Sequence, residues 1–514
     1  MQRSFCGAAV VILALAAPAW LRAQFGAAPA GTSPRAAQLP ISGRTGQQGS
    51  VATVQNPLPG GTQSVNTITS SVQVQGAYQG SVPSAASPGA PLPLSLAEAI
   101  RRGLQYNLST IAFQNGVRQA HAERVLELAN LLPNITSNLL LTEQQTNLAA
   151  FGFNFQLPVP GFSIPTVVGP FHYFDLRAHV TQTVANFTTL RNYRATEQTL
   201  RATQLSAQDA RDLVVLAVTG GYLSIISAAA RIDSARAQVV TAQATYQQAV
   251  DRHNAGVTAR IEVTRSQVEL QTQQQRLTSQ ETDFAKQKIG LGRVIGLPAG
   301  QDFTLTDALP FVPLTGLTLD QALTRALATR PDLKAAQAQV QAADLVRKAA
   351  VAERYPSVDL AGDYGAIGTS PQNSHGTFSV TGTLRFPIWQ GGRVRGDIEQ
   401  ADAALQQRRS EYEDLRGRVD ADVREAFLDL TAAANQVGVA QSNRDLAGDT
   451  LTQARDRFAA GVADTIEVIQ AQESVATAEL DYISSIYAHN LAKASLARAM
   501  GQADQGIQQL LGRP

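Results

Sequence analysis

The sequence predicts a mainly α-helical, internally duplicated fold in which two long helical hairpins are joined to four amphipathic β-strands. Three observations predict it. A set of motifs occurs twice, roughly 200 residues apart. Four segments alternate between apolar and polar residues. Two proline-free stretches of about 65 residues consist mostly of good helix formers.

The duplication rests on two pairs of motifs. Leu94-Ser-Leu-Ala-Glu-Ala-Ile recurs as Leu317-Thr-Leu-Asp-Gln-Ala-Leu, and Arg252-His-Asn-Ala-Gly-Val recurs as Arg457-Phe-Ala-Ala-Gly-Val. In both copies Ile-Glu-Val follows shortly after the second motif. Units of this length are too long for solenoid repeats, so each copy is a domain-sized unit.

Four strand segments have one apolar and one polar face. They are residues 135–142 and 174–184 in the first copy, and 358–364 and 378–386 in the second. A pair of half-buried soluble hairpins would give the same pattern, but the strand lengths match a membrane span. Four strands cannot close a membrane barrel, because the smallest have about eight. Several chains must therefore pool their strands, and three chains would give twelve.

The helical stretches are residues 186–252 and 391–457. Each would extend for roughly 95–100 Å at 1.5 Å per residue. A helix of this length is rare in a compact domain, so it suggests an elongated structure that spans a distance. Each reverses at a glycine, Gly256 or Gly461, and returns as a second long helix. Residues spaced by three and four predict a coiled-coil seam: Tyr222, Ile225, Ala229 and Ile232, and in the second copy Phe427, Leu430, Ala434 and Val437.

The N-terminal segment has the order of a secretory signal peptide, with Arg3, a short apolar core at residues 10–17 and a small residue, Ala23, at the expected cleavage site. Cys6, the only cysteine, lies before that core, so we expect no lipid anchor, disulfide or thiolate metal site in the mature chain. Residues 24–93 are rich in Gly, Pro, Ser, Thr, Gln and Ala and predict a mostly disordered extension. Within it, residues 70–79 alternate weakly and are a candidate strand.

Charge and motif content exclude several function classes. Lys plus Arg number 42 and Asp plus Glu number 41, which gives no basic field for nucleic acid. No nucleophile elbow or zinc-protease motif is present, and the six histidines are scattered. We therefore expect no enzyme activity, no metal site and no cofactor.

The duplicated motifs resemble those of the TolC-like family of outer-membrane efflux proteins, the outer-membrane factors, over residues 94–501. Phe386-Pro-Ile-Trp-Gln-Gly-Gly-Arg resembles the strand-to-helix junction of that family. The first-copy junction, Val184-Ala-Asn-Phe-Thr-Thr-Leu, lacks the proline and glycines, so the local bend need not be the same there.

The resemblance implies a homotrimer in the outer membrane of a Gram-negative bacterium. Twelve strands would form one barrel in outer-membrane lipid, and the hairpins would continue it as an α-helical barrel across the periplasm. Segments 94–132 and 317–353 would form an equatorial belt with the parts around Gly296 and Gly501. The implied partners are a periplasmic adaptor of the membrane-fusion class and an inner-membrane efflux pump or ABC transporter, with no nucleic acid.

Six segments are expected along the chain. They are a signal peptide (1–23), the extension (24–93), the first TolC-like repeat (94–300), a linker (301–316), the second repeat (317–503) and a C-terminal tail (504–514).

The resemblance also implies a pore gate just past the two glycine turns, where the family places acidic rings. Glu467 occupies one such position, Gln470 replaces the next acidic residue, and Asp464 precedes them. In the first copy Glu262 matches Glu467, but Arg265 stands where Gln470 does. Three copies of Glu467 would favour cations. The alternative is that Glu467 is an ordinary solvated helix carboxylate. A further hypothesis is that Arg265 pairs with an acidic group and holds the gate shut.

The turns themselves resemble the tips that dock an adaptor's helical hairpin. The candidate docking residues are Arg252, Gly256, Val257, Arg457, Gly461 and Val462. Arg252 and Arg457 would complement helix C-termini there. The alternative is that these residues only cap the helices.

The function expected from these features is a passive exit duct for a tripartite efflux or type I secretion system, gated at its periplasmic end. The competing interpretation is a secreted periplasmic coiled-coil scaffold or adhesin without a pore. The transported substrate is not specified by the sequence.

Overall fold

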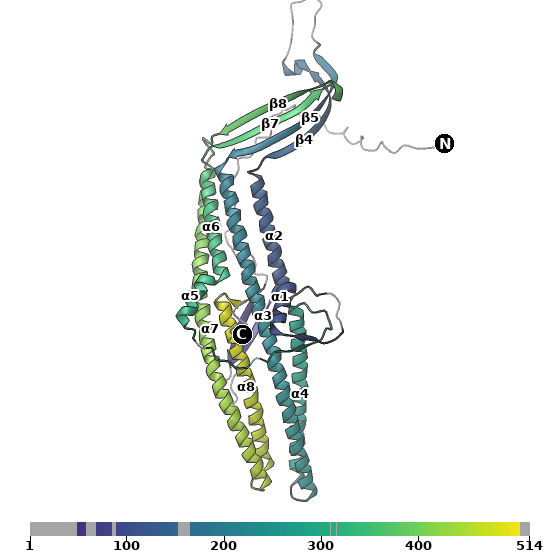
Figure 1. Ribbon diagram of the computed structural model, residues 1–514, viewed down its shortest axis with the longest axis vertical. Helices are drawn as coiled ribbons and strands as arrows, with labels where there is room; N and C mark the ends of the chain where they lie inside the picture. Colours follow the sequence, from purple (N-terminus) through teal and green to yellow (C-terminus); the bar gives the residue numbers. More distant parts are fainter. Residues whose placement is uncertain are drawn as a thin grey trace, which may run out of the picture.

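The protein is elongated, with a small β-sheet at one end and long helices running away from it (Figure 1). The computed structural model describes residues 49–57, 68–84, 89–152, 165–308, 310–314 and 316–503. The expected signal peptide and C-terminal tail lie outside the described residues. Within them, the predicted mainly α-helical, duplicated fold with four amphipathic strands is confirmed.

The sheet consists of the four predicted strands. They are β4 (Asn134–Asn147), β5 (Val167–Ala185), β7 (Ser357–Gly368) and β8 (Ser374–Arg385). The order is β4-β5-β7-β8, every pair is antiparallel, and each copy contributes one hairpin. Two short 3₁₀ turns, Leu148–Phe151 and Pro371–Asn373, follow β4 and precede β8.

One face of this sheet is apolar and exposed. Leu139 lies opposite Leu176, and Tyr364 lies opposite Phe378, so the apolar residues of neighbouring strands share a face. Tyr364 is 70% exposed and Phe378 is 75% exposed. Among the described residues, the outer edges of β4 and β8 have no strand partner. A sheet with an exposed apolar face and two open edges is not complete within one chain.

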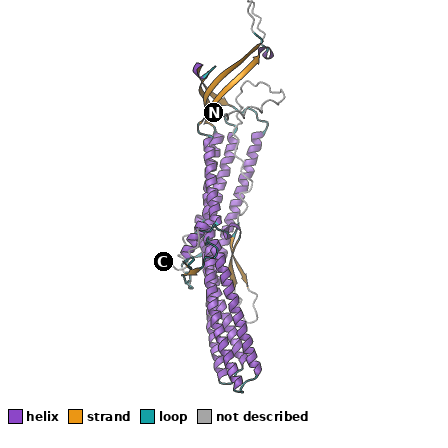
Figure 2. Ribbon diagram, turned by 90° about the vertical axis from the view of Figure 1, so that its right-hand side faces the viewer, coloured by secondary structure: helices purple, strands orange, loops and turns teal. Residues whose placement is uncertain are grey.

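Two helices run nearly the whole length of the molecule. They are α3 (Phe187–Asn254, 68 residues) and α7 (Arg393–Ala459, 67 residues), close to the predicted bounds. Each reverses into a shorter partner, α4 (Arg260–Val294) or α8 (Thr465–Ala499). The two hairpins extend side by side away from the sheet (Figures 1 and 2).

Most of the predicted seam lies in the core, although Ala229, Phe427 and Ala434 are only partly buried. Tyr222, Ile225 and Ile232 are buried in α3, and Leu430 and Val437 are buried in α7. Among the described residues, α3 is the one helix with a window long and apolar enough to cross a membrane, and 67% of that window is buried. This stretch packs in the main hydrophobic core at mid-height, so packing inside the protein accounts for its apolar character.

The belt segments divide into a short and a long helix. The first gives α1 (Leu96–Tyr106) and α2 (Leu108–Ala129). The second gives α5 (Leu319–Thr329) and α6 (Pro331–Ala352). Because α2 and α6 run up beside α3 and α7 towards the sheet, the expectation that these whole segments form an equatorial belt is wrong (Figure 1).

Different residues cause the two breaks. Asn107 is fully buried; its side chain caps α2 at Ser109 N (3.0 Å) and donates to the Tyr78 carbonyl (2.9 Å). In the second copy Pro331 is the first residue of α6, a position where its missing N–H costs nothing. The duplicated opening motif supplies the caps before them, Ser95 for α1 and a capping box at Thr318 for α5.

Part of the N-terminal extension is ordered. Strands β1 (Val51–Pro57) and β2 (Ile68–Val74) form an antiparallel hairpin, followed by a 3₁₀ turn at Gly76–Gln79. A third strand, β3 (Leu92–Leu94), pairs in parallel with β6 (Phe303–Leu305). The expectation of a mostly disordered extension is therefore wrong for these residues, whereas the candidate strand within 70–79 is confirmed for its first half.

The β1–β2 hairpin is held by packing against the helices. Val51 and Tyr78 are buried in the main core, and Val72 packs so closely on α3 that a Cβ at Gly220 would lie 2.2 Å from it. Thr53 Oγ1 lies 3.2 Å from Ser495 Oγ on α8. An isolated two-stranded hairpin is marginal in water, so these contacts explain why the segment folds.

The two strand-to-helix junctions differ, as their sequences indicate. In the first copy Asn186 follows β5 directly, and its side chain caps α3 by accepting from Thr188 N (3.0 Å) and Thr189 N (3.1 Å). In the second copy a connection leads from β8 to α7, and Gly391 (φ 59°) and Gly392 (φ 84°) make the bend. Trp389 on this connection is 86% exposed.

A buried histidine in α8 predicts a pH dependence of stability. His489 is fully buried against Phe311, with ring centroids 4.6 Å apart. Burial, reinforced by the nearby Lys493, lowers the pKa of His489 from 6.5 to about 4. The unfolded chain therefore binds a proton that the folded chain does not between these pH values, and stability should fall as the pH drops from 6.5 towards 4.

The change to test this is His489→Gln. We expect the loss of melting temperature between pH 6.5 and pH 4 to be smaller in the variant, since up to about 3 kcal/mol of linkage is removed. The measurement is the melting temperature of the detergent-purified protein at both pH values. Equal pH-dependent losses in both proteins would contradict the assignment.

Candidate functional site at the hairpin tips

The predicted gate and docking residues all lie at or near the far ends of the two hairpins, opposite the sheet (Figure 1). The first tip joins α3 to α4 and the second joins α7 to α8. No group of three metal-ligating side chains is close together in the described part of the chain.

Each tip is built on the same glycine-centred helix end. Gly256 has φ 74° and Gly461 has φ 75°, the left-handed region. Val257 N donates to Arg252 O (2.9 Å), and Val462 N donates to Arg457 O (2.9 Å). These bonds from the second residue past the C-cap are those of a Schellman motif, which pairs carbonyls that the helix leaves open.

The two valines after the glycines are exposed. Val257 is 67% exposed and Val462 is 71% exposed. In the Schellman motif a hydrophobic residue at this position often packs back on its own helix, and here neither does so fully. The tips therefore present a small apolar side chain each, next to capped backbone.

The candidate docking arginines have different partners. Arg252 crosses to the other hairpin, where its guanidinium donates to Phe458 O (3.3 Å) and lies 4.3 Å from the Phe458 ring centroid. It thus complements the C-terminus of α7, not that of its own helix. Arg457 stays within its hairpin and pairs with Glu467 at 3.4 Å.

The candidate gate residues of the second tip form one local group. Asp464 is the N-cap of α8 and accepts from Glu467 N at 3.1 Å. Glu467 in the first turn of α8 pairs with Arg457 and remains partly exposed. Gln470 is exposed, one turn further along. A carboxylate in the first turn is also favoured by the helix dipole.

The first tip has a different charge arrangement. Helix α4 begins at Arg260 without a side-chain cap, and Glu262 lies in its first turn. Arg265 pairs with Glu262 across one turn at 2.8 Å, so the acidic partner of Arg265 in this chain is on the same helix. The two tips therefore share their backbone geometry and differ in electrostatics.

The sequence did not predict the residues that make contacts between the two hairpins. Arg276 on α4 makes two hydrogen bonds to Glu473 on α8, at 2.8 and 3.1 Å. Gln472 on α8 donates to Thr245 on α3 at 2.9 Å. These partners are about 200 residues apart in the chain, and no local motif signals such pairs.

The geometry agrees with comparisons to known proteins. The profile described as outer membrane efflux protein matches residues 100–297 and 322–502, one segment in each copy. The chain belongs to the outer membrane efflux protein family. It is accordingly an efflux-channel protein of the outer membrane and not an enzyme, and the TolC-like resemblance is confirmed.

Relatives are distant in sequence. The pyoverdine export outer membrane protein OpmQ of Pseudomonas putida is 25% identical over 424 residues, covering 79% of this chain and 85% of that protein. Outer membrane protein OprJ of Pseudomonas aeruginosa is 26% identical over 327 residues, which cover 61% of this chain and 64% of OprJ.

Solved structures show the same fold. The CmeC outer membrane channel of Campylobacter jejuni has a TM-score of 0.69 at 14% identity, covering 81% of this chain and 89% of that chain. The outer membrane protein VceC of Vibrio cholerae has a TM-score of 0.65 at 18% identity, covering 79% and 96%.

The left-handed glycines at the tips give a direct test of this geometry. Gly461→Ala should lower stability by about 1–2 kcal/mol, because an L-residue is strained at this φ although a Cβ would meet nothing within 4 Å. Gly448→Ala is the matched control, since Gly448 lies inside α7 with equally open space. There alanine should stabilise the helix by about 0.5–1 kcal/mol.

The measurement is chemical or thermal unfolding of both variants in detergent. A loss of stability in Gly461→Ala together with a gain in Gly448→Ala would support the turn geometry. Two variants that shift stability in the same direction would contradict it.

Proposed function

We propose that the protein is the outer-membrane exit duct of a tripartite efflux or type I secretion system, working as a homotrimer. The observation that carries this proposal is the four-stranded sheet, which has an exposed apolar face and, among the residues that the structure describes, no strand partner at the outer edges of β4 and β8. In hydrocarbon every backbone N–H and C=O must be paired, and only a closed barrel of strands achieves this. Three chains supply twelve strands, an even number within the range of known membrane barrels.

The helices supply the rest of the duct. At 1.5 Å per residue the 68 residues of α3 extend for about 100 Å, enough to reach far into the periplasm from the sheet. In this proposal the duct is passive. A periplasmic adaptor at the tips and an inner-membrane pump or ABC transporter would supply coupling and energy.

The docking proposal rests on the exposed tips. Val257 and Val462 are apolar side chains at the extreme end of each hairpin, next to capped backbone that needs no further partner. Such a surface suits the apolar face of a helical hairpin from an adaptor. The contacts of Arg252 with Phe458 and of Arg457 with Glu467 do not compete with docking.

The experiment is imaging of the detergent-purified protein by electron microscopy, combined with conductance in planar bilayers. We expect threefold tapered cylinders whose helical part is roughly 100 Å long, and we expect discrete channels. Monomers that stay soluble without detergent and give no conductance would instead support the secreted coiled-coil scaffold or adhesin.

The gate proposal concerns Arg265 and the acidic groups. Near a threefold axis, three copies of Glu262 repel one another unless Arg265 compensates them, and Glu467 is held by Arg457 in the same way. Arg265→Ala should raise the open probability in single-channel recordings. If the loss of Arg265 raises the repulsion among the three Glu262 carboxylates of the closed state by about 0.3–0.5 kcal/mol per chain, the open-to-closed ratio rises roughly four- to twelvefold.

Lys286→Ala is the matched control, because Lys286 forms an i,i+3 pair with Asp283 on the same helix, remote from the tip. It should leave the open probability unchanged. An Arg265→Ala channel that stays as closed as the parent would remove Arg265 from the gate.

A further inference from the structure

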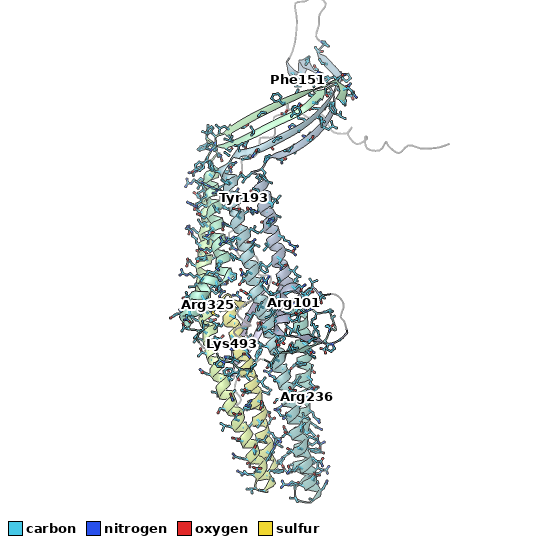
Figure 3. All side chains as sticks on the ribbon, in the orientation of Figure 1. Arg101, Phe151, Tyr193, Arg236, Arg325 and Lys493 are labelled. Atoms are coloured by element: carbon cyan, nitrogen blue, oxygen red, sulfur yellow. The ribbon has the colours of Figure 1, made fainter. Side chains whose placement is uncertain are left out.

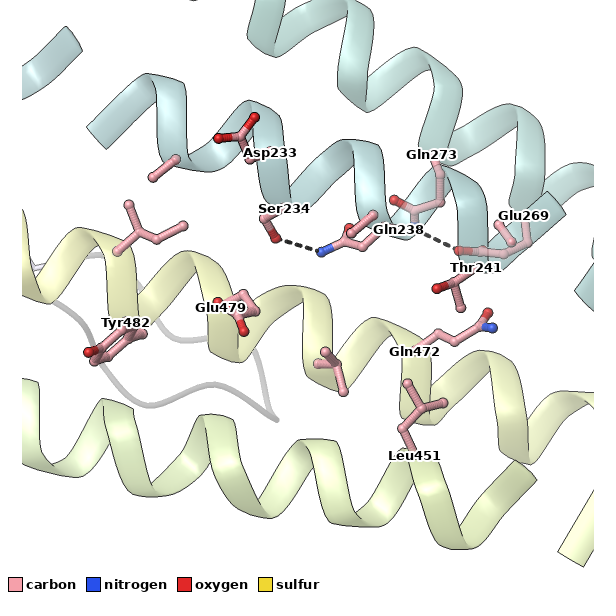
Figure 4. A pocket seen from close by; sticks show the side chains of 15 residues that line it. Asp233, Ser234, Gln238, Thr241, Glu269, Gln273, Leu451, Gln472, Glu479 and Tyr482 are labelled. Carbon is pink, nitrogen blue, oxygen red and sulfur yellow. Dashed lines mark hydrogen bonds between the residues drawn. The ribbon is translucent and has the colours of Figure 1, made fainter. Parts of the chain in front are cut away.

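A cavity of about 440 Å³ lies between the two hairpins, well above their tips (Figure 4). Its walls come from α3 and α4 of the first repeat and from α7 and α8 of the second. This volume is in the range of small-molecule sites. The gate and docking residues of the tips do not line it.

The cavity lining is rich in hydrogen-bond acceptors and carries one sign of charge. Its carboxylates are Glu269, Glu479 and Asp233, and its fifteen lining residues include no Lys, Arg or His. The Asp233 side chain is 80% exposed and pairs with Arg236 at 3.7 Å, so Glu269 and Glu479 are the carboxylates available to a ligand. Uncharged polar side chains such as Gln238 and Thr241, and apolar side chains such as Ala237 and Val475, form the rest of the wall. A ligand that fits these walls is a cation with an apolar body.

Two buried amides give a second, independent indication of the ligand. Gln273 is 3% exposed and Gln472 is 7% exposed, and the carbonyl oxygen of each amide has no hydrogen-bond partner among the described residues. A buried acceptor without a donor is costly, typically by about 1–3 kcal/mol, so both oxygens favour a donor from a ligand.

The orientation of both amides follows from their other bonds. Gln273 donates through Nε2 to the Glu269 carboxylate at 2.7 Å, which can only accept. Gln472 donates through Nε2 to Thr245 Oγ1, whose proton is already given to the Thr241 carbonyl at 3.1 Å. In each case the amide nitrogen is fixed, and the carbonyl oxygen must therefore be the free group.

The spacing of acceptors along α8 suggests the length of the ligand. Gln472 and Glu479 are seven residues apart, which places them on the same helix face about 10 Å apart. Figure 4 shows Asp233, Glu479 and Tyr482 towards one end of the cavity and Glu269, Gln273 and Gln472 towards the other. Two donor groups separated by an aliphatic chain match this arrangement better than a single compact ion.

We propose that this cavity binds aliphatic diamines and polyamines, with one ammonium group at Glu479 and the other at Glu269 and the carbonyl oxygens of Gln273 and Gln472. The ligand bridges the first repeat to the second. Binding therefore opposes separation of the two hairpins, a consequence that rests on the proposed channel function; the binding itself does not.

The test is isothermal titration calorimetry of the full-length protein in detergent at low ionic strength. The probe is 1,8-diaminooctane, and 1,8-octanediol is its neutral analogue of the same length. We expect saturable binding of the diamine and none of the diol. Glu479→Gln should weaken diamine binding about tenfold or more, because a charge-assisted hydrogen bond is lost.

Glu413→Gln is the matched control: it removes one exposed carboxylate from α7 outside the cavity and should leave binding unchanged. Gln273→Met keeps the side-chain length, removes the acceptor and should also weaken binding. If that variant does not fold, Glu479→Gln decides alone. Equal binding of diamine and diol, or equal weakening by Glu479→Gln and Glu413→Gln, would overturn the proposal even in a protein that forms normal channels.

Discussion

The requirement that backbone groups be paired in hydrocarbon governs the whole architecture. Each unpaired N–H or C=O in lipid costs several kcal/mol, so an open sheet cannot stay in a bilayer. In the part of the chain that the structure describes, the outer edges of β4 and β8 have no strand partner, and the apolar face they share with β5 and β7 is exposed. The same constraint that makes the sheet unstable alone makes assembly favourable, because closing the barrel pairs both edges at once. In the proposed trimer the long helices are therefore attached to a closed barrel and not to the sheet of a single chain.

At their strand-to-helix junctions and their tips, the two copies have related backbone courses and different side chains. One enters its long helix through an asparagine cap at Asn186, and the other through the left-handed pair Gly391 and Gly392. At the tips the glycine turns are alike, yet Asp464 caps α8 whereas α4 begins without a side-chain cap. The backbone geometry of the tips is retained because few backbone conformations can make such a turn. Charge is free to diverge, and it makes the two halves unequal.

The long-period features could be predicted from the sequence because each depends on neighbours in the chain. Helix periodicity gave the course of α3 and α7, alternation gave the four strands, and Gly256 and Gly461 gave the reversals. The β1–β2 hairpin was missed because its stability comes from Val51 and Val72 packing on helices far along the chain. Gln472 was missed for the same reason, because its partner Thr245 lies 227 residues away on α3. Gln273 donates to Glu269 on its own helix, and it was missed because helix packing buries its carbonyl oxygen without a donor.

The strengths of the contacts indicate where the molecule can move. Near mid-height Arg330 is 3% exposed and binds Asp332 and Asp422 at 2.7 and 2.8 Å; removing one partner of such a buried group costs about 3–5 kcal/mol. Closer to the tips, the Arg276–Glu473 pair joins the two hairpins, and both of its side chains are about 40% exposed. Exposed ion pairs of this kind contribute about 0–1 kcal/mol to stability. Within a hairpin, by contrast, Phe458 and Val468 belong to a buried seam. Each hairpin should therefore move as one body about a fixed middle, and the weak polar contacts between hairpins are the ones that a ligand or a docked partner can outweigh.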